Sequence, residues 1–322
     1  MYNVSGSPKP TRPILLLLLA MIAGFANAEG RATDVASGQY ELQSGALMRS
    51  YLLHVPKQLT QPAPLVIVMH GYTGSADSIM SYSGMNEVAD EEGFVVVYPQ
   101  GTVDQQGNAF FNVGYEFHSD SSVDDLQFIR DLVAHLQGQL ALNPDKVFAT
   151  GMSNGADMSY VLACQASDLI RAAAPIAGIM MKETFETCSP SRPLPIFEVH
   201  GTKDEVSLFT GDMENSGGWG PYLDLPATIA LWVALNELTL TQSSKLPNNA
   251  ANDGSHIIFD RYWSASHNNE VWFYKVIEGG HHWPGVQLDW WRNPLAWWYF
   301  RNANQDVDTS RMVWSFFETM SD

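Results

Sequence analysis

Short apolar runs alternate with helical patterns along most of the chain. Four runs are rich in branched and aromatic side chains and are bounded by Gly, Pro or Asp, namely residues 64–69, 94–98, 147–150 and 194–199. Continuous apolar runs of this length are typical of strands buried on both faces, as in a parallel sheet. Residues 46–55 alternate more and predict an antiparallel edge strand, and residues 271–277 predict the last strand.

Helical spacing appears between these runs, most clearly in residues 124–140 and 228–238. Strands that alternate with helices predict an α/β protein: a mostly parallel sheet flanked by helices, in a three-layer sandwich. No internal repeat and no Pro/Gly/Ser-rich linker divides the chain after its first segment. A single domain is therefore expected from about residue 35 to residue 322.

An aromatic segment follows the last predicted strand and fits this pattern poorly. Residues 286–304 carry six aromatic side chains: Trp290, Trp291, Trp297, Trp298, Tyr299 and Phe300. One interpretation is a buried helix or loop that adds a layer to the core. The other is an aromatic wall or lid over a substrate cleft, in which Trp290 and Trp291 contact the substrate.

The first 28 residues are set apart from the rest. Lys9 and Arg12 precede an apolar run over residues 14–25, and the small residues Ala26 and Ala28 supply a cleavage site. This order predicts a secretory signal peptide, residues 1–28, that is cleaved near Ala28. We expect an extracellular or periplasmic protein, and no membrane span, because the apolar run is too short to cross a bilayer.

The overall composition restricts the partners. Hydrophobic residues make up 45% and charged residues 16% of the sequence, which predicts a globular protein with a sizeable core. The formal charge is −18. Such a surface repels nucleic acid, so no nucleic-acid partner is expected.

Cys164 and Cys188 are the only cysteines. In the oxidising compartment that the signal predicts, two cysteines normally pair, and a disulfide between them is expected to contribute about 3 kcal/mol. Two buried free thiols are the alternative. A catalytic cysteine is not expected, because neither residue stands beside a histidine or a turn motif.

A candidate nucleophile lies in the sequence Gly-Met-Ser-Asn-Gly, residues 151–155. The motif follows a predicted strand and precedes a helical pattern, which is the context of the G-x-S-x-G turn that exposes a catalytic serine. A helix that begins just after Ser153 directs its positive end at developing negative charge. An ordinary glycine-rich turn is the alternative.

A serine hydroxyl needs a base, and the base needs an acid that orients it. Asp204 follows the predicted strand 194–199 and is the candidate acid, with Glu205, Asp212 and Asp224 as weaker alternatives. The sequence Gly-Gly-His-His-Trp-Pro-Gly, residues 279–285, follows the last strand and supplies the base. Spacing alone does not choose between His281 and His282.

Two backbone N–H groups are expected to form the oxyanion hole. One belongs to Asn154, the residue after the nucleophile, and the other is assigned to Tyr72 in the loop His-Gly-Tyr-Thr-Gly, residues 70–74. A metal site is the competing interpretation of the histidines. Neighbouring residues such as His281 and His282 point in divergent directions and no H-E-x-x-H motif is present, so neither metal nor cofactor is expected.

These motifs resemble the secreted polyhydroxybutyrate depolymerase-like esterases and the related feruloyl and acetylxylan esterases of carbohydrate esterase family one. The resembling segments cover most of residues 60–285 and include HGYTGSA, ATGMSNGADM, HGTKDEV and GGHHWPG. The resemblance implies an α/β-hydrolase fold with Ser153, Asp204 and His281 as the catalytic triad. His282 is then the variable position of the motif.

An ester hydrolase that acts through an acyl-enzyme is therefore predicted. Its substrate is expected to be polymeric or polymer-derived: feruloyl or acetyl esters of polysaccharide, or poly(3-hydroxybutyrate)-type polyester. Along with Trp290 and Trp291, His282 and Trp283 are the candidate substrate contacts. The first alternative is a non-catalytic polysaccharide-binding protein on an esterase scaffold. A serine peptidase is the lower-ranked alternative.

Overall fold

The computed structural model describes residues 1–3, 35–59, 61–250, 252–286 and 302–321. The chain divides into two compact units, Met1–Ala32 and Thr33–Asp322. Residues 4–28 of the predicted signal peptide lie outside the described residues, and so do Trp290, Trp291 and residues 287–301 of the aromatic segment.

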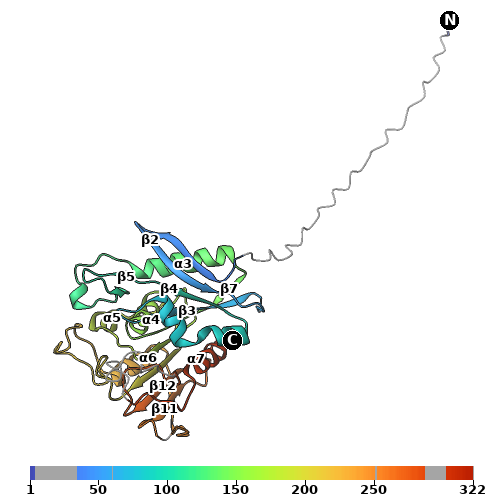
Figure 1. Cartoon of the computed structure of the whole chain (residues 1–322). Helices are drawn as coiled ribbons and strands as arrows, with labels where there is room; N and C mark the ends of the chain where they lie inside the picture. The colour runs from blue at the N-terminus through green and yellow to red at the C-terminus, as the bar shows by residue number, and fades with distance from the viewer. Residues whose placement is uncertain (4–34, 60, 251, 287–301, 322) are drawn as a thin grey trace. The chain divides into compact units, whose positions relative to one another are not determined.

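A ten-stranded sheet forms the centre of the second unit (Figure 1). Its order is β1 (Gly38–Ser44), β2 (Leu47–His54), β4 (Val95–Pro99), β3 (Ala63–Met69), β7 (Leu142–Met152), β8 (Ala172–Ile176), β9 (Ile196–Gly201), β12 (Val271–Ile277), β11 (His256–Trp263) and β10 (Leu240–Lys245). The strands from β4 to β12 in this order are parallel, and antiparallel pairs extend both ends. The predicted α/β class with a mostly parallel sheet is confirmed.

The predicted edge strand is antiparallel but does not lie at the edge. Residues 46–55 contain β2, and β1 pairs along its outer side in a hairpin. β1 alternates between exposed and half-buried positions, so it lacks the apolar run that marks the inner strands. A separate two-stranded pair consists of β5 (Thr102–Val103) and β6 (Ala109–Phe110).

Helices cover both faces of the sheet. They are α1 (Ala76–Ser83), α2 (Met85–Glu92), α3 (Asp125–Gln139), α4 (Asn154–Gln165), α5 (Lys182–Thr187), α6 (Leu225–Leu235) and α7 (Thr309–Thr319), with a short 3-10 helix η1 (Glu116–His118). One core packs under α3, α4 and α6, and the other under α1, α2 and α7. Adjacent residues of β3, such as Ile67 and Val68, enter opposite cores, as the alternation of a strand requires.

The predicted disulfide is confirmed. Cys164 and Cys188 are bonded, with a sequence separation of 24 residues. The bridge joins the last turn of α4 to the residue that follows α5. It therefore fixes the far end of the helix that begins just after Ser153.

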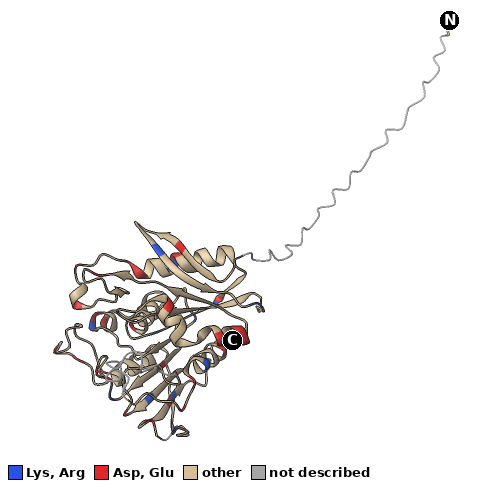
Figure 2. Cartoon of the chain, viewed as in Figure 1, with Lys and Arg blue, Asp and Glu red and all other residues tan. Residues whose placement is uncertain are grey.

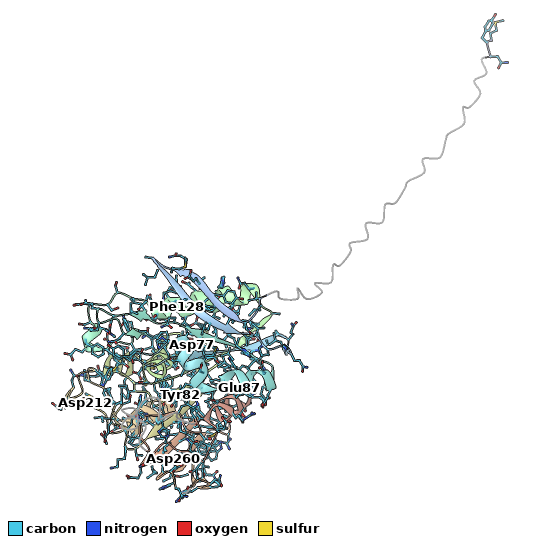
Figure 3. All side chains as sticks on the ribbon, in the orientation of Figure 1. Asp77, Tyr82, Glu87, Phe128, Asp212 and Asp260 are labelled. Atoms are coloured by element: carbon cyan, nitrogen blue, oxygen red, sulfur yellow. A yellow bond between two sulfur atoms is a disulfide. The ribbon has the colours of Figure 1, made fainter. Side chains whose placement is uncertain are left out.

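Charged side chains are scattered over the helices, strands and loops (Figure 2). One buried pair ties β2 to α3: an Arg49 guanidinium nitrogen lies 2.5 Å from a carboxylate oxygen of Asp125. The same guanidinium stacks on the ring of Phe128, labelled in Figure 3, at 3.9 Å from the ring centroid. No helix in the described ranges is long and apolar enough to cross a bilayer.

Candidate active site

Ser153 occupies a strained turn between a strand and a helix. β7 ends at Met152, α4 begins at Asn154, and the serine has φ 56° and ψ −123°. A positive φ is costly for a residue with a side chain and persists where the surroundings enforce it. Here a Cβ on Gly155 would lie 2.2 Å from the carbonyl oxygen of Met69. The close approach of β3 and α4 therefore requires glycine beside the serine and holds the turn.

Asp204 and His281 are brought together by the loops that follow β9 and β12. His281 Nδ1 lies 2.7 Å from Asp204 Oδ2. The two loops are joined by a hydrogen bond from the Lys203 N–H to the Gly279 carbonyl, at 2.9 Å. Because β9 and β12 are parallel neighbours, their carboxyl ends meet at one edge of the sheet.

Asp204 is only 3% exposed, yet its carboxylate is well satisfied. Oδ1 accepts hydrogen bonds from the N–H groups of Val206 and Ser207, each at 2.8 Å. Burial alone would raise the pKa of Asp204. Contact with His281, the charge of His200 and the backbone donors outweigh burial, and the pKa is lowered. Asp204 is therefore ionised at neutral pH.

The loop after β3 lies directly against the serine. A Cβ on Gly71 would be 3.3 Å from Ser153 Cβ and 3.8 Å from Ser153 Oγ. Among the described residues, the N–H groups of Tyr72 and Asn154 have no hydrogen-bond partner. The Tyr72 hydroxyl is engaged elsewhere, because it donates to Asp104 Oδ2 at 2.6 Å. One free backbone donor, the N–H of Asn154, thus follows the serine in the chain. The other, the N–H of Tyr72, lies in the neighbouring loop after β3.

The structure does not join Ser153 to the acid–base pair by a hydrogen bond. In the described part of the chain, Ser153 Oγ has no hydrogen-bond partner, and Nδ1 of His281 is used by Asp204. The pair nevertheless leaves Nε2 of His281 available. Hydrogen bonds of this kind often tighten only when substrate binds.

His282 and Trp283 lie in the interior. His282 Nδ1 donates to the Gly280 carbonyl at 3.0 Å, and its Nε2 accepts the N–H of Asn304 at 2.8 Å. Burial lowers the pKa of His282 to about 4, so the ring is neutral at pH 7. Trp283 is 1% exposed and donates its indole N–H to Ser310 Oγ at 3.1 Å. Both side chains are thus occupied by contacts within the protein rather than presented to a ligand.

The loop that carries these residues is also fixed from the opposite side. The backbone N–H of Trp283 donates to the hydroxyl of Tyr82, labelled in Figure 3, at 3.2 Å. Since Tyr82 belongs to α1, the histidine loop is held both by the β9 loop and by α1. This anchoring fixes the position of His281.

Sequence reasoning missed Glu198 and a group of aromatic rings beside the site. Glu198 lies on β9, behind Asp204, and the signal was a single charged residue inside an apolar strand. Phe117 and Trp219 pack near Tyr72, with ring centroids 5.7 Å and 5.8 Å from its ring. Phe117 is also exposed. No spacing in the sequence links these aromatic residues, because the fold brings them together from distant loops.

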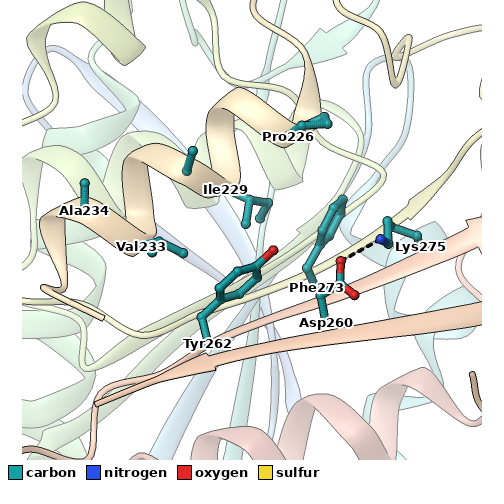
Figure 4. A pocket seen from close by; sticks show the side chains of 9 residues that line it. Pro226, Ile229, Val233, Ala234, Asp260, Tyr262, Phe273 and Lys275 are labelled. Atoms are coloured by element: carbon teal, nitrogen blue, oxygen red, sulfur yellow. Dashed lines mark ion pairs between the residues drawn. The ribbon is translucent and has the colours of Figure 1, made fainter. Parts of the chain in front are cut away.

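A separate pocket of about 330 Å³ lies between α6 and the strands β11 and β12 (Figure 4). Its lining includes Ile229, Tyr262 and Phe273, with an ion pair between Lys275 and Asp260 at 2.6 Å. Of the predicted site residues that the structure describes, none lines it. Within the described ranges, no group of three His, Cys, Asp or Glu side chains is placed to hold a metal ion.

The central parallel strands, with a serine turn after β7 and acid and histidine loops after β9 and β12, define an α/β-hydrolase. A solved structure supports the fold. The acetyl xylan esterase from Aspergillus awamori superposes with a TM-score of 0.54 at 17% identity, over 76% of this chain and 94% of that one.

The sequence comparisons identify the family. Residues 49–212 match the family model of the esterase PHB depolymerases, and the chain belongs to that family. Feruloyl esterase B from Piromyces equi is 30% identical over 62% of this chain and 38% of its own length. Poly(3-hydroxyalkanoate) depolymerase C from Paucimonas lemoignei is 28% identical over 60% of this chain and 45% of its own. The expected resemblance is confirmed, and the chain spans less than half of these two relatives.

Proposed function

We propose that the chain is a serine carboxylic-ester hydrolase. The observation that carries this proposal is the Asp204–His281 pair, at 2.7 Å, at the same sheet edge as the strained turn of Ser153. Family membership supports it. Acyl transfer by a serine requires both an exposed serine hydroxyl and an oriented imidazole base.

In the proposed reaction Ser153 Oγ attacks the ester carbonyl, and His281 Nε2 accepts the hydroxyl proton. Asp204 keeps the proton of His281 on Nδ1 and stabilises the imidazolium that forms. The N–H groups of Tyr72 and Asn154 donate to the oxyanion, and the positive end of α4 adds to this stabilisation. His281 then protonates the leaving alcohol, and water hydrolyses the acyl-enzyme by the same steps in reverse.

The proposed substrate is a feruloyl or acetyl ester of a polysaccharide, or a poly(3-hydroxybutyrate)-type polyester. The names of the relatives support both classes. The exposed ring of Phe117 and the neighbouring Trp219 offer aromatic faces beside the Tyr72 loop, and such faces stack on phenolic rings and sugars. We further propose that the enzyme acts outside the cytoplasm, which the disulfide supports.

The test is hydrolysis of p-nitrophenyl acetate by the wild type, Ser153→Ala and Asp204→Asn. Loss of activity in Ser153→Ala supports the proposal. Equal activity in the wild type and in Ser153→Ala contradicts it. No activity in the wild type, together with binding of polysaccharide, would favour the binding-protein alternative. A panel of methyl ferulate, acetylated xylan and 3-hydroxybutyrate oligomers then separates the substrate classes.

A further inference from the structure

A second carboxylate–imidazole pair lies behind the Asp204–His281 pair. Glu198 is fully buried in β9, with an exposed fraction of 0%. Its Oε1 lies 3.1 Å from Nδ1 of His200, two residues further along the strand. Its Oε2 accepts a hydrogen bond from the hydroxyl of Tyr160 at 2.7 Å. A buried carboxylate is costly unless it is paired, and Glu198 is paired on both oxygens, with Tyr160 of α4 and with His200, which precedes the acid loop.

His200 connects this pair to Asp204. Its Nε2 lies 2.8 Å from the carbonyl oxygen of Ser207 and 3.4 Å from Asp204 Oδ2. A carbonyl oxygen only accepts, so Nε2 carries a proton. The ring therefore stands between two carboxylates, and an unbroken series of polar contacts runs from Tyr160 through Glu198, His200 and Asp204 to His281.

The remaining question is which atom holds the proton between Glu198 and His200. Burial raises the pKa of Glu198 to about 7. The pKa of His200 is raised as well: burial lowers it, but Glu198 and Asp204 together outweigh burial. The ionised Asp204 beside Nε2 favours the imidazolium, because a cation between two buried anions is better paired than a neutral ring.

Other titratable groups also face this cluster. Asp157 of α4 lies 2.6 Å from the Tyr115 hydroxyl, and burial raises the pKa of Asp157 to about 7. Burial also raises the pKa of Tyr222, whose hydroxyl accepts the Leu208 N–H at 3.1 Å, so the phenol is neutral. Neither group contacts His200 directly. The charge on His200 is thus set mainly by Glu198 and Asp204.

We propose that Glu198 and His200 are positioning residues that place a protonated imidazole against Asp204, keeping this buried acid ionised and aligned for His281. The proposal rests on the triad of the proposed function. Two backbone donors hold Oδ1 of Asp204. The His200 charge supplies the matching stabilisation on the Oδ2 side, so that both oxygens of the acid are compensated.

The first experiment is the pH profile of kcat/KM for p-nitrophenyl acetate, in the wild type and in Glu198→Gln. The acid limb reports protonation of His281 in the free enzyme. Glutamine keeps the shape of Glu198 but removes the charge that holds the proton on His200. Without the positive charge of His200 nearby, His281 binds its proton more tightly. The acid limb is expected to move to higher pH.

Thr150→Val is the matched control. Thr150 is buried on β7 and donates to the Ala174 carbonyl at 2.6 Å, so the variant loses a buried hydrogen bond without any change of charge. Its acid limb should coincide with that of the wild type, even where its stability is lower. A Glu198→Gln profile that also coincides with the wild type overturns the proposal.

A second measurement needs no substitution in the network. The 15N signals of the His200 ring distinguish an imidazolium from either neutral tautomer, and they are expected to show both nitrogens protonated at pH 7. A neutral His200 ring overturns the proposal. If instead Ser153→Ala hydrolyses the ester as well as the wild type does, the triad itself fails, whereas the state of His200 is still read from these signals.

Discussion

The bridge between Cys164 and Cys188 sets a measurable part of the stability. It closes a loop of about 25 residues, from a sequence separation of 24. The loss of loop entropy in the unfolded chain then corresponds to about 3.5 kcal/mol at 25 °C. A folded unit of about 290 residues has an unfolding entropy near 0.6 kcal/mol/K, so Tm should fall by about 6 °C without the bridge.

The perturbation is the double variant Cys164→Ala, Cys188→Ala, with reduced wild type as the control for the lost sulfur atoms. Tm is followed by circular dichroism. Cys164 lies eleven residues from Ser153, about 16 Å along α4. Activity at 25 °C should therefore be retained. A double variant and a reduced wild type that both melt within a degree of the oxidised protein would refute the loop-entropy reasoning. Loss of activity with an unchanged Tm would refute the separation of the bridge from the site.

Three further outcomes are expected. Gly155→Ala should lower the free energy of unfolding by about 1–3 kcal/mol, because its Cβ would lie 2.2 Å from a backbone oxygen of Met69. Urea titration measures this free energy. In the same titration Gly138→Ala, with nothing within 4 Å of the new Cβ, should be neutral or stabilising. His281→Ala should lose turnover of p-nitrophenyl acetate by roughly a thousandfold or more, and His282→Ala far less; the reverse order would contradict the assignment of the base. For His282→Gln, the difference in free energy of unfolding from the wild type should become smaller as pH falls. Burial lowers the pKa of His282 in the folded chain to about 4. Between about pH 6.5 and pH 4, the unfolded chain therefore binds a proton that the folded chain does not bind. The wild type loses up to about 3 kcal/mol between pH 6.5 and 4 that the variant keeps, and a gap that is constant with pH would contradict this.

The sequence predicted the inner strands well, because burial on both faces leaves an apolar run that few other structures produce. β3, β4, β9 and β12 lie within two residues of the predicted ranges. β8 was missed because four of its five residues, Ala-Ala-Ala-Pro, lack the branched side chains that mark a strand. β10 was missed because almost all of its residues are exposed, and β11 because its partly buried residues form a weaker pattern.

The candidate site was predicted as far as local motifs reach. Ser153 and the loops of Asp204 and His281 follow strand ends, and strand ends can be placed from the pattern of apolar runs. The contacts of His282 and Trp283 depend on Asn304 and Ser310, which approach from the C-terminal region and leave no trace in local spacing. Glu198 is a buried charge whose meaning depends on Tyr160 of another element. Tertiary packing, rather than sequence spacing, determines the contacts that such residues make.

The most direct test of the central claim is covalent labelling with a fluorophosphonate, which reacts with a serine only when a neighbouring base activates it. The folded wild-type protein should carry one label, located by peptide mass spectrometry at Ser153. His281→Ala and the unfolded wild type should carry none. A folded protein that stays unlabelled at Ser153, or a label that persists there in His281→Ala, would contradict the proposed catalytic site.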